Sequence, residues 1–261
     1  MPKINVNDIE IYYEIYGEGF PLIMTTGLAG DSNWWSLEEI KGYSRHFKVV
    51  IFDNRGAGRT DKPKEKYSIK QFAIDVLGLM DALKIEKAHI LGTSMGGMIA
   101  QEIAINHPER VAKLVLCSTH CGGLRKINPS QEVLDMMTSP NQDLIDGIIS
   151  LCFTTKIVKK NPESVLDFKK RISKTRIPPK SYMLQLRSVD SFDTCSQLKK
   201  IAAPTLILHG KDDLLIPAAN AEILVKEIPN AKIKILEPEG HWIFLPNWEK
   251  IMKIIINFLI D

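Results

Sequence analysis

The chain has 261 residues, of which 44% are hydrophobic and 25% are charged, and its formal net charge is +3. This composition is ordinary for a globular protein and excludes a disordered, collagen-like or coiled-coil chain. The 34 basic and 31 acidic residues are interspersed, so no basic stripe favours a nucleic-acid partner. No apolar run approaches the ~20 residues of a membrane span, and we therefore expect no membrane partner.

Residues 1–8 contain no apolar signal core, which predicts a protein that is not secreted. The four cysteines are Cys117, Cys121, Cys152 and Cys195. Because they have no CxxC spacing and no second ligand pair, we expect no zinc site. We expect all four to be reduced and mostly buried thiols in a cytoplasmic protein.

Residues 3–16 alternate polar and apolar side chains around Asn7 and Asp8, a pattern that predicts a β-hairpin with its turn at these two residues. Beyond Gly19, short apolar runs alternate with helical patterns. The runs lie at residues 22–24, 49–52, 89–91, 114–116, 205–208 and 233–236. Most are almost continuously apolar, as expected of strands that are buried on both faces of a parallel sheet.

Three helical patterns between and after these runs are clear. A capping box at Ser68 and Gln71 predicts a helix that begins after Ser68 and has apolar side chains at helical spacing up to Leu83. A second pattern, 95–106, follows a strand directly, and a third, 247–259, has one apolar face. This alternation predicts an α/β fold with an open, mostly parallel central sheet that is flanked by helices.

The alternation stops between residues 121 and 195, where no convincing strand is present. Helical patterns lie near 130–138, 142–152, 161–174 and 179–188. A helical segment of roughly 65–75 residues is too long for a loop and must pack on another part of the chain. We therefore predict a helical cap at 121–195, inserted into a core that comprises residues 1–120 and 196–261.

The segment Gly92-Thr93-Ser94-Met95-Gly96 lies between a predicted strand and a predicted helix. A serine on such a sharp turn stands at the edge of the sheet with its hydroxyl outward, and the flanking glycines avoid a clash. The helix N-terminus that follows provides backbone N–H groups and a positive dipole end, which favour a developing negative charge. The pattern predicts that Ser94 is a nucleophile rather than an incidental residue of a glycine-rich turn.

A serine hydroxyl needs a general base. His241 lies in a loop after the last predicted strand, at the edge of the sheet where ligands bind, and is the preferred base. His120 and His209 lie near the same edge and remain alternatives. The base in turn needs an orienting carboxylate, and two adjacent candidates, Asp212 and Asp213, follow the preceding predicted strand.

The order of Ser94, Asp213 and His241 along the chain resembles the nucleophile-acid-histidine order of the α/β-hydrolase family. In that family the acid commonly lies three residues after a glycine and four before a proline. Gly210 and Pro217 have this spacing, so the resemblance selects Asp213 over its neighbour.

Two further segments, 52–60 and 106–111, resemble the loop after the family's fourth strand and the join before its sixth strand. In the first of them we expect Asp53 and Arg55 to tie loops together. The resemblance covers essentially the whole chain and is closest to small carboxylesterases and 3-oxoadipate enol-lactonases. It implies an α/β-hydrolase fold.

The resemblance also implies an oxyanion hole formed by the backbone N–H groups of Leu28 and Met95. The family often has a His-Gly pair after its third strand, where this chain has Thr26 and Gly27. The glycine, which we expect at the substrate, is retained, whereas the histidine that usually supports this loop is missing. Trp34 follows the loop and is a candidate for the substrate pocket.

The predicted reaction is hydrolysis of a small carboxylic ester or lactone through an acyl-enzyme, without a metal or an organic cofactor. A serine at position 94 disfavours the dehalogenases and epoxide hydrolases of this fold, which use an aspartate. Two alternatives remain: hydrolysis of a carbon–carbon bond in a vinylogous diketone, and a hydrolase-like ligand receptor. The expected partner is a small molecule, and a lactone with a carboxylate would need a cation such as Arg125, Lys126 or Arg187.

Overall fold

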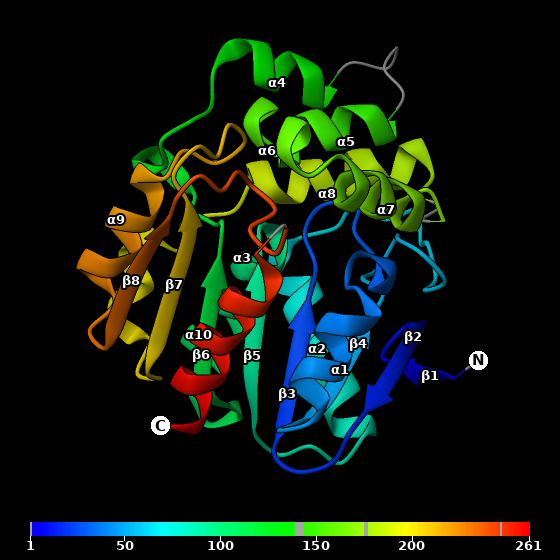
Figure 1. Ribbon diagram of the computed structural model, residues 1–261. Helices are drawn as coiled ribbons and strands as arrows, with labels where there is room; N and C mark the ends of the chain where they lie inside the picture. Colours follow the sequence, from blue (N-terminus) through cyan, green and yellow to red (C-terminus); the bar gives the residue numbers. More distant parts are fainter. Residues whose placement is uncertain (1, 139–143, 175–176, 246) are drawn as a thin grey trace.

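A central β-sheet organises the molecule, as the computed structural model shows for residues 2–138, 144–174, 177–245 and 247–261 (Figure 1). Within these residues the sheet has eight strands in the order β1-β2-β4-β3-β5-β6-β7-β8. The strands are β1 (Lys3–Val6), β2 (Ile9–Tyr16), β3 (Pro21–Thr25), β4 (Lys48–Phe52), β5 (Ala88–Thr93), β6 (Val111–Cys117), β7 (Thr205–Gly210) and β8 (Ala231–Leu236). Every strand that the sequence predicts is therefore present.

The sheet is antiparallel at one edge and parallel elsewhere. β1 pairs with β2, and β2 pairs with β4, in antiparallel fashion, while β4, β3, β5, β6, β7 and β8 run parallel to their neighbours. The pairing of Val6 with Ile9 leaves Asn7 and Asp8 as the turn, which confirms the predicted hairpin. Because the parallel strands share one direction, their carboxyl ends meet at one edge of the sheet, where α/β proteins bind ligands.

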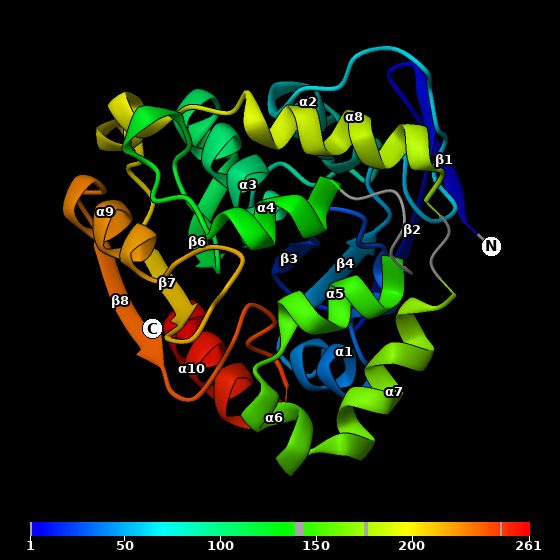
Figure 2. The ribbon, with the colours of Figure 1, turned by 90° about the horizontal axis from the view of Figure 1, so that it is seen from above.

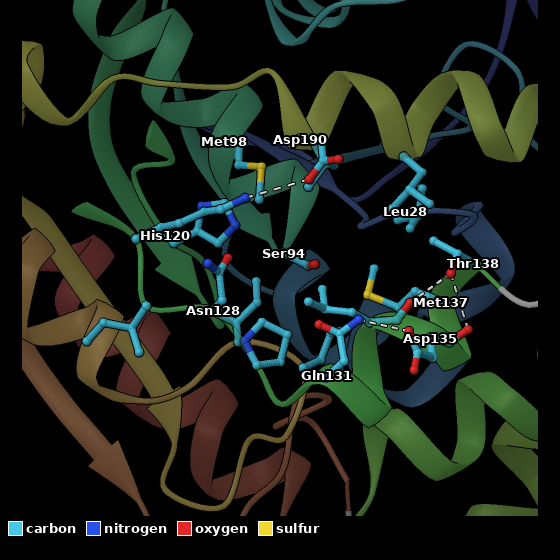
Figure 3. Close-up of a pocket in the computed structure, with 18 residues that line it drawn as sticks. Leu28, Ser94, Met98, His120, Asn128, Gln131, Asp135, Met137, Thr138 and Asp190 are labelled. Atoms are coloured by element: carbon cyan, nitrogen blue, oxygen red, sulfur yellow. Dashed lines mark hydrogen bonds and ion pairs between the residues drawn. The ribbon is translucent and has the colours of Figure 1, made fainter. Parts of the chain in front are cut away.

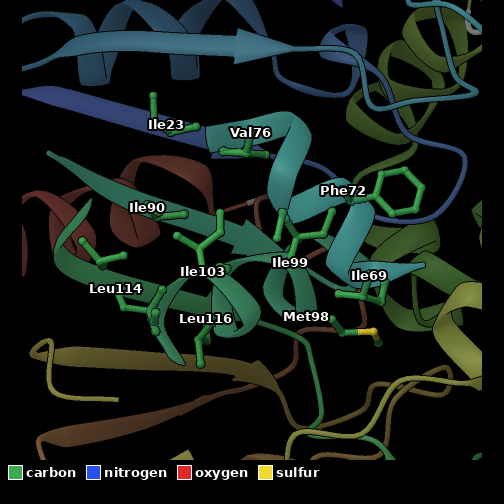
Figure 4. Packing of buried hydrophobic residues seen from close by; sticks show 14 of the residues in the cluster. Ile23, Ile69, Phe72, Val76, Ile90, Met98, Ile99, Ile103, Leu114 and Leu116 are labelled. Carbon is green, nitrogen blue, oxygen red and sulfur yellow. The ribbon is translucent and has the colours of Figure 1, made fainter. Parts of the chain in front are cut away.

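Helices cover both faces of the sheet. The helices α2 (Ile69–Ala82), α3 (Met95–Asn106) and α9 (Ala219–Glu227) pack on one face, and α1 (Leu37–Ser44) and α10 (Trp248–Ile260) pack on the other. Side chains of one strand alternate between the two cores: Ile23 belongs to the α2–α3 core shown in Figure 4, whereas Leu22 and Met24 belong to the α1–α10 core. This two-sided burial explains why the strands are almost continuously apolar.

Local signals set the helix starts, with one correction. The Ser68 side chain accepts a hydrogen bond from the Gln71 backbone N–H (3.1 Å), but the Gln71 side chain donates to Asp75 instead of returning to Ser68. The predicted capping box is therefore only half formed. The box with both bonds lies at the start of α1, between Ser36 and Glu39.

A helical insertion, defined as residues 121–195, separates β6 from β7. Its helices are α4 (Gln131–Thr138), α5 (Leu144–Cys152), α6 (Thr155–Lys160), α7 (Pro162–Ile172) and α8 (Pro179–Asp190). The insertion lies above the carboxyl ends of the parallel strands (Figures 1 and 2). The helix predicted from 142 is observed from Leu144, and positions 142 and 143 lie outside the described residues.

Short 3₁₀ turns occupy Ser32–Trp34, Pro108–Arg110, Gly123–Arg125 and Cys195–Lys200. The last two lie at the ends of the insertion, where Gly122 and Asp193 form an isolated antiparallel bridge. No helix among the described residues has both the length and the apolar character that a membrane crossing requires.

The prediction of four reduced cysteines is wrong for two of them. Cys121 and Cys195 form a disulfide across 74 residues of sequence, whereas Cys117 and Cys152 are free and buried. The chain leaves the core at Cys121 and returns to it at Cys195, and the bridge between Gly122 and Asp193 holds the two ends side by side. A spacing rule based on nearby cysteines does not detect such a long-range pair.

Candidate active site

Ser94 stands on a strained turn between β5 and α3. Its backbone has φ 55° and ψ −121°, a left-handed conformation that a residue with a side chain rarely adopts. The Ser94 N–H donates to the Cys117 carbonyl (2.9 Å), and the Ser94 carbonyl accepts from the Thr119 hydroxyl (2.9 Å). These bonds to the end of the neighbouring strand β6 hold the turn, and the serine is placed at the carboxyl edge of the sheet.

The glycines around Ser94 are required by close backbone contacts. A Cβ on Gly92 would lie 2.2 Å from the Gly96 carbonyl oxygen, and a Cβ on Gly96 would lie 2.4 Å from the Thr25 carbonyl oxygen. A Cβ on Gly27 would lie 2.9 Å from the Ser94 Cβ. The turn at Ser94 and the loop after β3 therefore pack so closely that a side chain on any of these three glycines would clash.

Asp213 and His241 come together from the loops after β7 and β8. The His241 Nδ1 lies 2.8 Å from the Asp213 Oδ2. The other carboxylate oxygen accepts hydrogen bonds from the backbone N–H groups of Leu215 (2.9 Å) and Ile216 (2.8 Å). Asp213 is buried, whereas its neighbour Asp212 is exposed, so the structure brings Asp213 to the histidine as the spacing rule predicts.

A second histidine, His209, also faces this carboxylate. Its Nε2 lies 3.2 Å from the Asp213 Oδ2 and 2.8 Å from the Ile216 carbonyl oxygen. Burial raises the pKa of Asp213, but the electrostatic interaction with His241 and the hydrogen bonds from both histidines outweigh it and lower this pKa to about 2. Both histidines therefore favour the ionised form of this carboxylate.

Two cavities meet at Ser94. The smaller one, of about 50 Å³, contains Ser94 and His241 and is otherwise mostly apolar, with Trp34, Leu151 and Trp242 among its walls. Trp34 lines this cavity and also packs in the core, where its ring contacts those of Trp242 and Phe168.

The larger cavity, of about 480 Å³, lies between the core and the insertion (Figure 3). Figure 3 shows Ser94 among side chains from the core, such as Met98, and from the insertion, such as Met137 and Asp190. Of the three cations considered in the sequence, Lys126 lines this cavity and lies 3.7 Å from Asp190. Arg125 pairs with Glu227, and Arg187 is exposed.

The alternative bases differ from His241 in their surroundings. His120 shares the larger cavity with Ser94, and burial lowers its pKa to about 4. The His209 Nε2 faces the Asp213 carboxylate and the Ile216 carbonyl oxygen. Of the two histidines that share a cavity with Ser94, His241 is the one with a carboxylate at hydrogen-bond distance.

The loop after β3 carries Gly27 and Leu28. Gly30 N–H donates to the Gly27 carbonyl (3.1 Å), and the Asn54 side chain donates to the Thr26 carbonyl (3.2 Å). Leu28 lines both cavities together with Ser94. Met95 is the first residue of α3, where backbone N–H groups have no carbonyl partner inside the helix.

The loop after β4 is tied down by charged pairs, as predicted. Asp53 accepts from the Ser32 hydroxyl (2.7 Å) and the Arg59 backbone N–H (2.7 Å). Arg55 is buried and binds Asp75 (2.7 Å) and Asp8 (2.7 Å).

Sequence reasoning missed one contact to the loop after β3. Gln185 of α8 accepts a hydrogen bond from the Ala29 N–H (2.9 Å) across 156 residues. No sequence motif marks this glutamine. Among the described residues, no three His, Cys, Asp or Glu side chains gather to form a metal site.

A serine on a strand-to-helix turn at the carboxyl edge of a parallel sheet, in one cavity with a carboxylate-bound histidine, is typical of α/β hydrolases. The α/β-hydrolase fold family matches residues 21–147 and 148–247, and the chain belongs to this family. The predicted fold and resemblance are confirmed.

Several known hydrolases are similar to the chain along most of its length. RutD of Azorhizobium caulinodans, whose name gives carbamate hydrolase as a provisional assignment, is 28% identical over 245 residues, covering 92% of this chain and 91% of that protein. A poly(3-hydroxyalkanoate) depolymerase of Ectopseudomonas oleovorans is 31% identical over 224 residues, covering 84% and 77%. The crystal structure of the enol-lactonase from Burkholderia xenovorans LB400 has a TM-score of 0.89 at 26% identity and covers 100% of both chains.

Proposed function

We propose that this α/β hydrolase cleaves small carboxylic esters or lactones through an acyl-enzyme on Ser94. The observation that carries the proposal is one arrangement: Ser94 on its strained turn opens into the same small cavity as His241, whose Nδ1 lies 2.8 Å from Asp213. A nucleophile, a base and an orienting carboxylate are the groups that acyl transfer requires.

In the proposed first step, the Ser94 Oγ attacks the carbonyl carbon while the His241 Nε2 takes the hydroxyl proton. Asp213 holds the imidazole so that Nδ1 carries the other proton, and it stabilises the imidazolium that forms. The tetrahedral intermediate collapses, and His241 gives its proton to the leaving alkoxide oxygen. Water then attacks the acyl-serine with the same proton transfers and releases the carboxylic acid.

The negative oxygen of the intermediate would be bound by the backbone N–H groups of Leu28 and Met95. Such a donor is worth about 3 kcal/mol in the transition state. The close packing of Gly27 on Ser94 supports this assignment, because it places the backbone of the loop after β3 next to the nucleophile.

The two cavities suggest how a substrate would lie. The small cavity has room for a short apolar chain beside Trp34, and the larger cavity can hold the rest of a small molecule. In this proposal the helical insertion acts as the cap that closes the substrate over Ser94. The protein's cytoplasmic location remains a prediction.

The proposal is tested first by replacing the nucleophile. We expect Ser94→Ala to lower kcat for p-nitrophenyl butyrate by four or more orders of magnitude and to leave the unfolding transition unchanged, because the side chain loses only its hydroxyl. Ser118→Ala, at a buried serine after β6, is the matched control and should retain activity. Near wild-type hydrolysis by the Ser94 variant would refute the mechanism.

A second measurement separates the reaction classes. A fluorophosphonate should form a covalent adduct on the peptide that contains Ser94. A panel of esters, lactones, carbamates and a vinylogous diketone should give the highest kcat/KM with an ester or lactone. A clear preference for carbamate or for carbon–carbon cleavage would move the function to that class. Negligible turnover together with tight ligand binding would instead favour a receptor.

A further inference from the structure

Gln185 of α8 joins the helical insertion to the loop that is proposed to form the oxyanion hole. Its side chain is completely buried, and both of its polar groups are used. The Oε1 accepts from the Ala29 N–H (2.9 Å), and the Nε2 donates to the Arg55 carbonyl (2.8 Å). One side chain of the insertion thus bridges two loops of the core.

The loop needs such support. Ala29 has φ 64°, a left-handed backbone conformation that is unfavourable for a residue with a Cβ. The peptide N–H that Gln185 binds is the one directly after Leu28, so this bond restrains the orientation of the Leu28 backbone. Ala29 is buried, and its N–H would lose its hydrogen bond if α8 moved away.

The other end of the bridge is firmly held. The Arg55 guanidinium is fixed by Asp75 and Asp8, so its carbonyl is a stable anchor for the Gln185 Nε2. The buried hydroxyl of Thr26, at the start of the loop after β3, has no hydrogen-bond partner among the described residues. The insertion therefore adds a second side-chain hydrogen bond to this loop, besides the one that Asn54 of the core donates to the Thr26 carbonyl.

We propose that Gln185 is a positioning residue that aligns the Leu28 N–H for the oxyanion, so that the oxyanion hole is complete only when α8 is packed on the core. This inference rests on the proposed function. It assigns the insertion a part in transition-state stabilisation besides its part in enclosing the substrate.

The test replaces the bridge without changing its bulk. Gln185→Met has a similar volume and no hydrogen bonds, and we expect kcat for p-nitrophenyl butyrate to fall on the order of 10- to 100-fold, with KM changed less than about 3-fold. The rate of fluorophosphonate labelling should fall in parallel, because that reagent also develops charge on an oxygen in the hole.

Two further variants keep the inference falsifiable. Ser188→Ala, on the same buried face of α8, removes a hydroxyl that donates to the Gln185 carbonyl within the helix (2.6 Å), and it should keep wild-type kcat. Gln185→Glu retains an acceptor for the Ala29 N–H and should recover part of the lost kcat, and it also serves if the methionine variant does not fold.

The outcomes separate this inference from the proposed function. If wild-type protein hydrolyses the ester and is labelled at Ser94, but Gln185→Met has unchanged kcat or only a raised KM and a lower Tm, Gln185 merely docks the insertion and the inference is wrong. If wild-type protein is not labelled at Ser94, the proposed function itself fails.

Discussion

The interior of the parallel core and the interface between the core and the helical insertion are made of different kinds of contact. Around Ser94, the strands β5 and β6 and the helix α3 are almost entirely buried and apolar. The insertion is uneven: α7 packs Phe168 against Trp34 and Trp242, whereas the buried residues of α8 are the polar Ser181, Gln185 and Ser188. α7 is thus anchored by apolar packing, whereas α8 adds the hydrogen bonds of Gln185 to the partly buried apolar contacts of Leu184 and Val189.

This difference separates two tasks. A close-packed apolar core has little freedom, so it can hold a strained turn at Ser94 and bring loops from β5, β7 and β8 to fixed distances. Between the core and the insertion, by contrast, a cavity of about 480 Å³ leaves space. In the proposed function, the core supplies Ser94, Asp213 and His241, while the insertion encloses the substrate and, through Gln185, supports the loop after β3.

The largest effect is expected in the core, at the carboxylate. Asp213→Asn should lower kcat by roughly 10³- to 10⁴-fold, because an amide does not hold His241 in the required tautomer. Asp212→Asn is the matched control, since Asp212 is exposed, and it should change kcat less than about 3-fold. Steady-state kinetics on both variants decide the matter, and the opposite ranking would move the acid by one residue.

An intermediate effect is expected where the two regions join. Replacing Cys121 and Cys195 together by alanine opens the ring that encloses the insertion and should lower the free energy of unfolding by about 2–4 kcal/mol. Urea denaturation measures this difference. A thiol reductant should destabilise the wild-type protein and leave the double variant unchanged, and alkylation of four thiols in non-reduced protein would contradict the pairing.

The smallest effect is expected in the insertion, on substrate choice. Leu151→Ala enlarges the small cavity and should raise kcat/KM for p-nitrophenyl hexanoate relative to the acetate by about 10-fold, since each methylene that a pocket accepts contributes about 1–3 kcal/mol. Leu134→Ala is the control, because Leu134 lines the larger cavity and not the small one, and it should leave this ratio unchanged. An equal shift in both variants would show that the two cavities do not sort the acyl chain.

Local patterns in the sequence predicted most of the fold. The six apolar runs and the hairpin at residues 3–16 are strands, because alternating or continuous apolar side chains directly reflect burial on one or both faces. Capping was predicted less well. At Ser68 the backbone bond forms, but the Gln71 side chain donates to Asp75, because residues four apart lie on the same helix face and their side chains can bond to each other.

For the site, the sequence by itself determined which residues could take part. The sharp turn at Ser94 is marked by Gly92 and Gly96. The spacing between Gly210 and Pro217 selects Asp213, the aspartate that the structure places beside His241. Each of these motifs spans only a few residues, so it can be recognised in the sequence without the structure.

Only the tertiary structure decided the contacts between distant segments. The disulfide spans 74 residues, and the bond between Gln185 and Ala29 spans 156. Such contacts depend on how whole elements pack, and no local preference of the chain encodes them. The size of the two cavities at Ser94 is set in the same way, by the position of the insertion over the sheet.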